Sequence, residues 1–296
     1  MGKRIGITLG DCAGIGPEIV DAALKSGRLS SAAEYQIIGR YPTCSLGQPN
    51  PDTARAAVAA MEEAATLAEN GAIDAVVTGP IHKAHMYNVG FEFPGQTEFF
   101  AARSGTTNFA MCLTGGKLTV GLVTTHIALR QVAESLHQSE IVRVGLLLGD
   151  FLRQTSRNSG RIGVAGLNPH AGESGKMGEE EIQIIAPAVA ELESKLRALD
   201  SQIGVTGPYS PDTVFHRAVQ GEFDAVLCMY HDQGLIPLKL HAFHDGVNTT
   251  LGLPFPRTSP DHGTAFDIAG KGMARADSMI AAINLAAELA SNKGNR

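Results

Sequence analysis

Residues 4–18 read R-I-G-I-T-L-G-D-C-A-G-I-G-P-E, an apolar run that passes through a glycine-rich turn into the start of a helix. A short apolar segment followed by a helical one is typical of the strand–helix units of α/β proteins. The glycines at positions 10, 14 and 16 let backbone approach backbone or a ligand closely. The turn has neither the G-x-G-x-x-G fingerprint nor the Lys-Ser/Thr of a phosphate-binding loop, so by itself it indicates only a structural turn.

The same alternation continues along the chain. Short apolar runs predict strands over 4–9, 36–39, 73–78, 109–113, 118–124, 161–167 and 224–229. Helical spacing predicts helices over 53–69, 139–154, 182–196 and 278–290, with a kink or a late start at Pro187 in the third. Nearly continuous apolar strands favour a mostly parallel sheet that is covered on both faces.

These patterns predict an α/β protein with a two-lobed α/β/α fold, a mostly parallel sheet and a cleft between the lobes. The hinge is expected near the helix 139–154 and its polar tail 155–160. The resulting lobes are approximately residues 1–20 with 135–270, and residues 21–134 with 271–296, in one catalytic unit.

Composition narrows the class of protein. The chain has 296 residues, 18% of them charged, and a net charge of −6, so no overall basic field favours nucleic acid or an acidic membrane. An anionic substrate therefore needs a local cationic pocket. The four cysteines form no C-x-x-C pair, which indicates thiols in a reducing compartment. With no signal sequence and no apolar run near the roughly 20 residues of a membrane helix, we expect a cytoplasmic protein.

Three of the ten histidines follow directly after predicted strands. They are His126 in T-T-H-I-A-L, His170 in N-P-H-A-G-E and His231 in M-Y-H-D-Q-G. Ligand sites of parallel α/β proteins form beyond the carboxyl ends of strands, so three histidines placed alike can converge on one cation. Imidazole suits Zn²⁺ and related divalent metals. The sequence predicts a metal site from the three together, although each histidine taken alone is better explained as an ordinary loop histidine. The alternative ligands, which follow strands less directly, are His82, His85, His241 and His244.

Two carboxylates near these histidines are candidate catalytic groups. Asp232 follows His231 directly, and Asp212 lies upstream in G-P-Y-S-P-D-T. A carboxylate beside a metal and a hydroxylated substrate can orient a ligand or take a proton. For Asp212, capping of a helix that begins at Thr213 is an equally good explanation.

Residues 239–272 hold a second group of candidates. Lys239, Asn248 and Arg257 stand among glycines and prolines, and in one pocket they can hold a phosphate or a carboxylate. The alternative is a solvated loop with incidental cations. Polar strand-end segments at 78–83 (T-G-P-I-H-K) and 94–98 (P-G-Q-T-E) add further candidate contacts.

Eight blocks between residue 9 and about residue 272 occur in the order of one known family. They are G-D-C-A-G-I-G-P-E, V-T-G-P-I-H-K, G-Q-T-E-F-F, T-T-H-I-A-L-R, G-L-N-P-H-A-G-E, G-P-Y-S-P-D-T, M-Y-H-D-Q-G-L-I-P-L-K and D-H-G-T-A-F-D-I-A-G-K-G. Together they resemble the 4-hydroxythreonine-4-phosphate dehydrogenase family. The last block also resembles the H-G-S-A-P-D-I-A-G loop of isocitrate and isopropylmalate dehydrogenases, and the first resembles their G-D-G-I-G-P-E opening. The resemblance therefore implies their fold rather than a Rossmann fold.

The resemblance implies an NAD(P)-dependent decarboxylating dehydrogenase. Its reaction oxidises the C3 hydroxyl of 4-phosphooxy-L-threonine, and the β-keto acid loses CO₂ to give 3-amino-2-oxopropyl phosphate for pyridoxal 5′-phosphate synthesis. It also implies a homodimer in which the two subunits share each active site, with NAD or NADP and one divalent metal (Zn, Mg, Co or Mn).

The resemblance assigns roles to four groups of residues. The metal ligands are His126, His170 and His231. The substrate-binding residues are Gln96, Thr97, Lys239, Asn248 and Arg257. The NAD(P) site is expected in the cleft, with the loop 262–270 near the adenosine half, and the cofactor-binding residues are Gly10, Asp11, Gly14, His262, Gly263 and Asp267. The candidate catalytic residues are Asp212, Asp232 and Lys239.

Three positions depart from the family pattern. Gln96 stands where the pattern G-H-T-E has a substrate-contacting histidine, Cys12 replaces the usual proline, and the chain is short between residues 40 and 55. The change at Gln96 bears on the substrate, and the main alternative is a dehydrogenase for 4-phospho-D-erythronate or D-threonate in sugar-acid catabolism. A phosphate acyltransferase of the same wider fold and a metal-dependent hydrolase are further alternatives, and a scaffolding role fits least.

Overall fold

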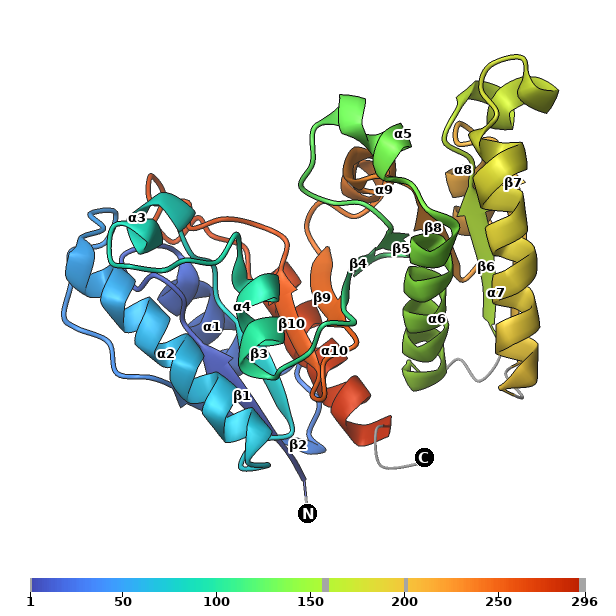
Figure 1. The fold of residues 1–296 in the computed structure, drawn as a ribbon. Coiled ribbons are helices and arrows are strands. Elements are labelled where there is room, and N and C mark those ends of the chain that lie inside the picture. The colour runs from blue at the N-terminus through green and yellow to red at the C-terminus, as the bar shows by residue number, and fades with distance from the viewer. Residues whose placement is uncertain (1, 156–159, 200–201, 293–296) are drawn as a thin grey trace. The chain divides into compact units, whose positions relative to one another are not determined.

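The computed structural model describes residues 2–155, 160–199 and 202–292. The chain divides into two compact units (Figure 1): the first comprises Met1–Thr107 and His244–Arg296, and the second Asn108–Phe243. This differs from the division predicted above (1–20 with 135–270, and 21–134 with 271–296). The reason is that the helix expected at the hinge, α6 (Gln138–Gln154), packs on strands of the second unit. Residues 156–159 of the predicted hinge lie outside the described residues.

The first unit has a sheet with the strand order β2-β1-β3-β10-β9. β1 pairs in parallel with β2 and β3, β10 pairs in parallel with β3, and β9 is antiparallel to β10. Its strands are β1 (Lys3–Thr8), β2 (Ala33–Ile38), β3 (Ala75–Thr78), β9 (Val247–Leu251) and β10 (Arg257–Pro260). Its helices are α1 (Gly16–Lys25), α2 (Pro51–Glu69), α3 (Lys83–Tyr87), α4 (Gln96–Arg103) and α10 (Asp277–Asn292).

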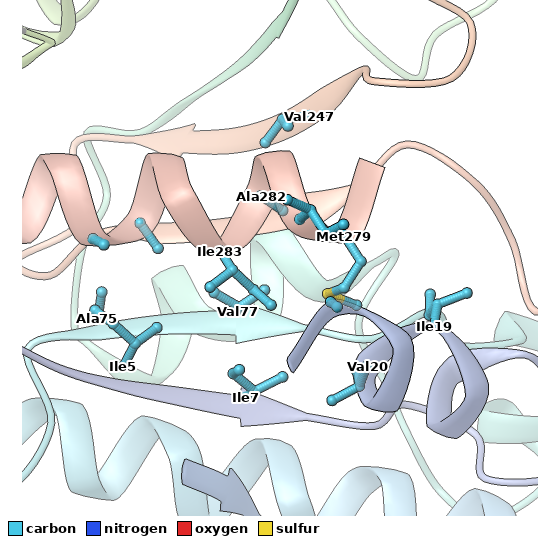
Figure 2. Close-up of a cluster of buried hydrophobic side chains, with 14 of the residues drawn as sticks. Ile5, Ile7, Ile19, Val20, Ala75, Val77, Val247, Met279, Ala282 and Ile283 are labelled. Atoms are coloured by element: carbon cyan, nitrogen blue, oxygen red, sulfur yellow. The ribbon is translucent and has the colours of Figure 1, made fainter. Parts of the chain in front are cut away.

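Alternating side chains of the strands build a core on each face of this sheet. Figure 2 shows Ile5 and Ile7 of β1 meeting side chains of α1 and α10 in one apolar cluster. Val76 of β3 points to the opposite face, into a cluster with Met61 of α2 and Phe100 of α4. Each fully buried Ile, Val or Met contributes about 1.5–3 kcal/mol. The sheet is therefore covered on both faces, as the apolar strand runs predicted.

The second unit repeats this layering with the strand order β4-β5-β8-β6-β7. β4 and β5 are antiparallel, and the other neighbours pair in parallel. Its strands are β4 (Ala110–Gly115), β5 (Leu118–Leu122), β6 (Gly160–Ala165), β7 (Ile203–Tyr209) and β8 (Ala225–Cys228). Besides α6, its helical segments are η1 (Leu129–Gln131), α5 (Val132–Ser135), η2 (Pro169–Gly175), η3 (Glu181–Ile185), α7 (Ala186–Ala198), α8 (Val214–Val219) and α9 (His231–His241).

The predicted α/β fold with a mostly parallel sheet and flanking helices is confirmed. Pro187 lies in the first turn of α7, so the late helix start is correct. The view of 239–272 as a loop is wrong, because this stretch contains the end of α9 and all of β9 and β10. Strand β7 was also missed. No helix in the described part of the chain is long and apolar enough to cross a membrane.

Candidate active site

A buried arginine is the centre of a polar cluster in the first unit. Arg257 opens β10, and its side chain is 2% exposed. Its Nη2 donates to Thr78 Oγ1 at 2.5 Å and to Gln96 Oε1 at 2.8 Å, and its Nη1 donates to Thr250 Oγ1 at 3.5 Å. These partners come from the end of β3, the first turn of α4 and the middle of β9. Four elements thus hold one guanidinium in place.

The positive charge of Arg257 has only neutral hydrogen-bond partners. Among the described residues no carboxylate lies within 4.0 Å of it, and its Nε atom is buried without a partner. Burial lowers the pKa of Arg257 to about 10, against a smaller opposing effect of Glu98, so the guanidinium stays charged at neutral pH. A buried charge without a counter-ion costs several kcal/mol. The arrangement therefore favours an anionic ligand.

Other donors surround this charge. Thr97 is buried in the first turn of α4, with its Oγ1 3.4 Å from Thr250 Oγ1. The open backbone N–H groups at a helix start favour an anion. Asn248 lies two residues before Thr250 on β9, hence on the same face of the strand. Its Oδ1, an acceptor, is buried without a partner among the described residues, so the side chain can contribute its amide N–H group to an anion and its oxygen to a hydroxyl of the same ligand. The cluster has the charge and the donors that a phosphate or carboxylate requires.

Four of the five predicted substrate residues (Gln96, Thr97, Asn248 and Arg257) therefore belong to the first unit. Lys239 lies on α9 in the second unit, so the structure does not group it with them. Gln96 occupies the position of the family histidine, and both ends of its amide are used: Nε2 donates to the carbonyl of Gly79 at 3.1 Å while Oε1 accepts from Arg257. Gln96 is thus a support for the arginine as well as a candidate substrate contact. Sequence reasoning missed Thr250, because β9 was not predicted as a strand.

Two histidines form the second cluster, which belongs to the second unit. His126 follows β5 and His231 begins α9 directly after β8, and β5 and β8 are paired neighbours. Their rings lie 5.5 Å apart between centroids, with 45° between the planes. They line a pocket together with Thr125, Ile127, Leu129, Val132, Tyr230 and Asp232. Adjacent strand ends bring together two of the three histidines that were predicted to converge.

Asp232 fixes the orientation of His231. Its Oδ1 lies 2.7 Å from His231 Nδ1, which leaves Nε2 as the ring nitrogen available to a ligand. A carboxylate on the far nitrogen is the usual support of a metal-binding histidine, because it sets the tautomer and the ring orientation. Asp232 is thus better placed to orient His231 than to act as a base.

His170 is held apart in an unusual turn. It lies in η2, where all residues from His170 to Gly175 have positive φ, between 44° and 91°. Four of these residues are not glycine, and a left-handed conformation costs each of them about 1–2 kcal/mol. Among the described residues no group of three His, Cys, Asp or Glu side chains is placed to hold a metal ion, so His170 does not join His126 and His231 within one chain.

A buried carboxylate stabilises this turn. Glu181 is 3% exposed, and its Oε1 accepts hydrogen bonds from the backbone N–H groups of Leu167 and Asn168, both at 2.7 Å. Its Oε2 accepts from Asn168 Nδ2 at 3.0 Å. These contacts fix the chain just before Pro169, from which the left-handed turn begins. Sequence reasoning did not single out Glu181, because nothing in its spacing pairs it with a segment 13 residues upstream.

We expect Glu181→Ala to destabilise the protein by about 2–4 kcal/mol, because the backbone N–H groups of Leu167 and Asn168 lose their charged acceptor and the Asn168 amide loses one of its two acceptors. Urea unfolding measures this change. The matched control is Glu180→Ala, which removes the 2.7 Å bond from Asn168 Nδ2 to a half-buried carboxylate and should cost about 1 kcal/mol or less. Equal effects of the two substitutions would contradict the role given to Glu181.

The predicted cofactor residues fall on two segments of the first unit that pack on each other. Gly10 has φ +71°, and a Cβ there would lie 2.1 Å from the carbonyl oxygen of Pro80. A Cβ at Gly14 would lie 2.7 Å from the carbonyl oxygen of Thr264. The buried Asp11 accepts from the N–H of Ala13 at 3.1 Å, within its own turn. Packing alone therefore explains these three residues. The other three stand on the facing segment, where Gly263 and Asp267 are exposed and His262 is half-buried.

The remaining candidates have local partners. Asp212 is exposed and accepts from Ser210 Oγ at 2.6 Å, and α8 has Thr213 as its N-cap without a side-chain cap, so the capping explanation is wrong. His241 Nε2 accepts from the backbone N–H of Lys117 at 3.2 Å, which gives it a structural role. The rings of His82 and His85 lie 4.2 Å apart in the first unit.

Comparison with known proteins identifies the family. The family described as "Pyridoxal phosphate biosynthetic protein PdxA" matches residues 17–286. The chain belongs to this family. The PdxA relatives include the 4-hydroxythreonine-4-phosphate dehydrogenase of Desulfosudis oleivorans, which is 43% identical over 99% of this chain and 97% of its own. They also include the D-threonate 4-phosphate dehydrogenase of Pectobacterium atrosepticum, which is 39% identical over 98% of this chain and 100% of its own.

Solved structures agree with this membership. The 4-hydroxythreonine-4-phosphate dehydrogenase of Klebsiella pneumoniae superposes with a TM-score of 0.80 at 40% identity, over 98% of this chain and 100% of that one. An isocitrate dehydrogenase from Methylococcus capsulatus has a TM-score of 0.52 at 18% identity, over 96% of this chain and 87% of that one, and so shares the fold alone. The fold expected from the glycine-rich blocks is confirmed, and the chain is a member of a dehydrogenase family.

Proposed function

We propose that this protein oxidises 4-phosphooxy-L-threonine with NAD or NADP and releases CO₂ to give 3-amino-2-oxopropyl phosphate, a step of pyridoxal 5′-phosphate synthesis. The observation that carries the proposal is the charged, buried Arg257, whose described partners are all neutral. A substrate phosphate supplies the missing negative charge. Family membership supplies the reaction class.

In this proposal the polar cluster around Arg257 binds the substrate phosphate. The Arg257 guanidinium binds phosphate oxygens by charge-assisted hydrogen bonds, which are roughly twice as strong as neutral ones. Thr97 and the first turn of α4 add neutral donors, and Gln96 holds the guanidinium in position. A firmly held phosphate orients the distant C3 hydroxyl, and this lowers the entropy lost on reaching the transition state.

His126 and His231 fit two ligands of a divalent cation. Their rings lie 5.5 Å apart, and Asp232 leaves the Nε2 atom of His231 available. We propose His170 of the partner subunit as the third ligand in a homodimer. When bound, Zn²⁺, Mg²⁺, Co²⁺ or Mn²⁺ supplies Lewis acidity toward the substrate hydroxyl and the ketone formed from it. In this scheme Asp232 keeps His231 in one tautomer, while Asp212 and Lys239 are the candidate proton carriers.

An apolar face on α9 supports the homodimer. Ile236, Leu240 and Phe243 are 66%, 88% and 74% exposed, at spacings that place them on one side of the helix or its end. Leu129, beside the histidine pocket, is 72% exposed. Large exposed apolar side chains that cluster mark association surfaces. A second copy of the chain covers them in this proposal.

A bound nicotinamide cofactor would supply the hydride acceptor of the proposed reaction. We assign it to the segment 262–267, where Gly263 and Asp267 are exposed and no atom lies within 4 Å of a Cβ built at Gly263. The turn 10–14, which packs against this segment, supports it from behind and is the second part of the proposed site. The unbridged cysteines suit the reducing cytoplasm, to which we assign the protein.

D-threonate 4-phosphate is the second candidate substrate. Relatives that bear this name are nearly as similar to the chain as the 4-hydroxythreonine-4-phosphate dehydrogenases. Gln96 is the residue that favours it, because a neutral amide stands where the family pattern has a histidine that can carry charge. Both substrates offer a terminal phosphate to Arg257, so the anion pocket serves either one.

The decisive assay follows reduction of NAD and NADP by the purified protein with each substrate in turn, in the presence of Zn²⁺, Mg²⁺ or Mn²⁺ and with a chelator control. Chelator-sensitive turnover of 4-phosphooxy-L-threonine is the expected result. Turnover of D-threonate 4-phosphate alone would select the second candidate. No reduction of either cofactor with either substrate would overturn the dehydrogenase proposal for this chain.

A further inference from the structure

Two of the four cysteines lie side by side in the first unit. The Sγ atoms of Cys12 and Cys44 are 3.5 Å apart. Cys12 belongs to the glycine-rich turn after β1, and Cys44 belongs to the irregular segment between β2 and α2. Both positions coincide with departures from the family pattern, since Cys12 replaces a proline and residues 40–55 are shortened. The proposed reaction uses neither thiol.

Backbone contacts on both sides of Cys44 hold its segment against the turn. The N–H of Gly47 donates to the carbonyl of Ala13 at 2.7 Å. On the other side, the N–H of Leu9 donates to the hydroxyl of Tyr41 at 2.8 Å. The proximity of the two sulfur atoms therefore follows from the fold around them.

The turn that carries Cys12 is itself fixed. The N–H of Asp11 donates to the carbonyl of Pro80 at 2.9 Å, and the N–H of Ile15 donates to the carbonyl of Thr264 at 2.9 Å. A disulfide needs an Sγ–Sγ distance of about 2.05 Å, so the sulfur atoms must approach by about 1.5 Å. Cys44 can supply this movement, because its segment has no regular secondary structure and Pro42 and Thr43 beside it are exposed.

We propose that Cys12 and Cys44 form an oxidative modification site that closes to a disulfide in the presence of a peroxide. The partly exposed Cys44 thiol reacts first: its sulfur is oxidised to a sulfenic acid, and hydrogen peroxide is reduced to water. The Cys12 sulfur then attacks the Cys44 sulfur, the S–O bond breaks, and a second water leaves with the Cys12 proton. In total two thiols lose two electrons and two protons, and one peroxide becomes two waters. A small dithiol reverses the reaction by thiol–disulfide exchange.

Burial sets the order of these steps and separates the pair from the other cysteines. Cys12 is 4% exposed, and burial together with the neighbouring Cys44 raises the pKa of its thiol to about 12. Cys12 therefore serves as the resolving thiol and not as the first to react, since the thiolate is the reactive form. Cys112 and Cys228 are fully buried, which raises the pKa of both thiols well above the usual range. Both should remain reduced.

The test treats the reduced, folded protein with one to a few equivalents of hydrogen peroxide, quenches it, unfolds it with denaturant and counts its thiols. We expect the count to fall from the four of the sequence to two, with a mass loss of about 2 Da. Peptide mapping without reductant should link the peptides of Cys12 and Cys44. A dithiol should restore all four thiols.

Two variants make the test specific. Cys44→Ser should keep its three remaining thiols under the same treatment, because no exposed thiol starts the reaction. Cys12→Ala should instead stop at a sulfenic acid on Cys44, which dimedone traps. Retention of four thiols by the wild type would overturn the proposal, as would a disulfide to Cys112 or Cys228. Loss of the Cys12 thiol in Cys44→Ser would overturn it equally.

Discussion

Replacing Arg257 with methionine is expected to lower kcat/KM severely while leaving the protein at least as stable as the wild type. The two effects have one cause. In the absence of ligand, the buried guanidinium has three neutral partners and no carboxylate within 4.0 Å among the described residues. Such a charge destabilises the fold by several kcal/mol, so an apolar side chain of similar length should leave the free energy of unfolding equal or higher. The same substitution removes the one buried cation of the proposed phosphate pocket.

The expected loss of kcat/KM in Arg257→Met follows from the strength of the arginine–phosphate contact. A bidentate charge-assisted contact with phosphate contributes about 3–5 kcal/mol, so kcat/KM should fall by roughly 10²–10⁴-fold. The rise in KM should account for only part of this, because a phosphate that no longer anchors the substrate also leaves C3 poorly oriented, which lowers kcat. Arg257→Lys keeps a charge but loses the planar fork, and should lie between the methionine variant and the wild type.

Steady-state kinetics with urea unfolding of the same samples measures both effects. The matched control is Arg103→Met, which removes an arginine of the same unit that is paired with Glu62 and half-exposed. It should lose a few tenths of a kcal/mol to about 1 kcal/mol and keep normal kinetics. If Arg257→Met were strongly destabilised and its folded fraction kept a normal KM, Arg257 would be a structural residue and the phosphate pocket would be wrong.

The fold was predictable wherever its local signals were strong. The strand β1 and the helix α2 were found within one or two residues, because an unbroken apolar run and an alanine-rich helix have distinct periods. Strand β9 was missed because three of the five residues in its sequence V-N-T-T-L are polar. Its threonines face Arg257 and the sheet interior, so tertiary contacts and not local propensity make it a strand.

The candidate site residues were likewise predictable only in part. Placement after strands predicted that three histidines converge, and His126 and His231 do lie close together, because β5 and β8 are paired neighbours and their carboxyl ends meet. The same rule does not bring His170 to them, since a left-handed turn supported by Glu181 follows β6. Thr78 meets Arg257, and Cys12 meets Cys44, only because the fold places distant segments side by side. No regular spacing in the sequence connects such residues, so these contacts could not be predicted from it.

His170→Ala and His231→Ala are each expected to be inactive alone and to regain activity when the two variants are mixed. In the proposed homodimer each metal site takes His126 and His231 from one subunit and His170 of the partner subunit. A dimer with one copy of each variant then has one complete site, while its other site lacks two ligands. Random exchange of subunits makes half of the dimers mixed, so the mixture should reach about a quarter of the wild-type activity. Each variant alone should lose roughly 10³-fold or more, because two ligands hold the cation weakly.

A mixture of His126→Ala and His231→Ala is the control for this complementation. The two histidines lie in one pocket of one chain, so each site of a mixed dimer still lacks one of them. This mixture should stay inactive under conditions that allow subunits to exchange, which a brief treatment with dilute urea and size-exclusion chromatography with a tagged copy can verify. Titration of each variant with Zn²⁺ gives a readout independent of turnover, and the restored tight sites should number one for each mixed dimer. Restored activity in the control mixture, or none in the first, would contradict a metal site in which His170 comes from the second subunit.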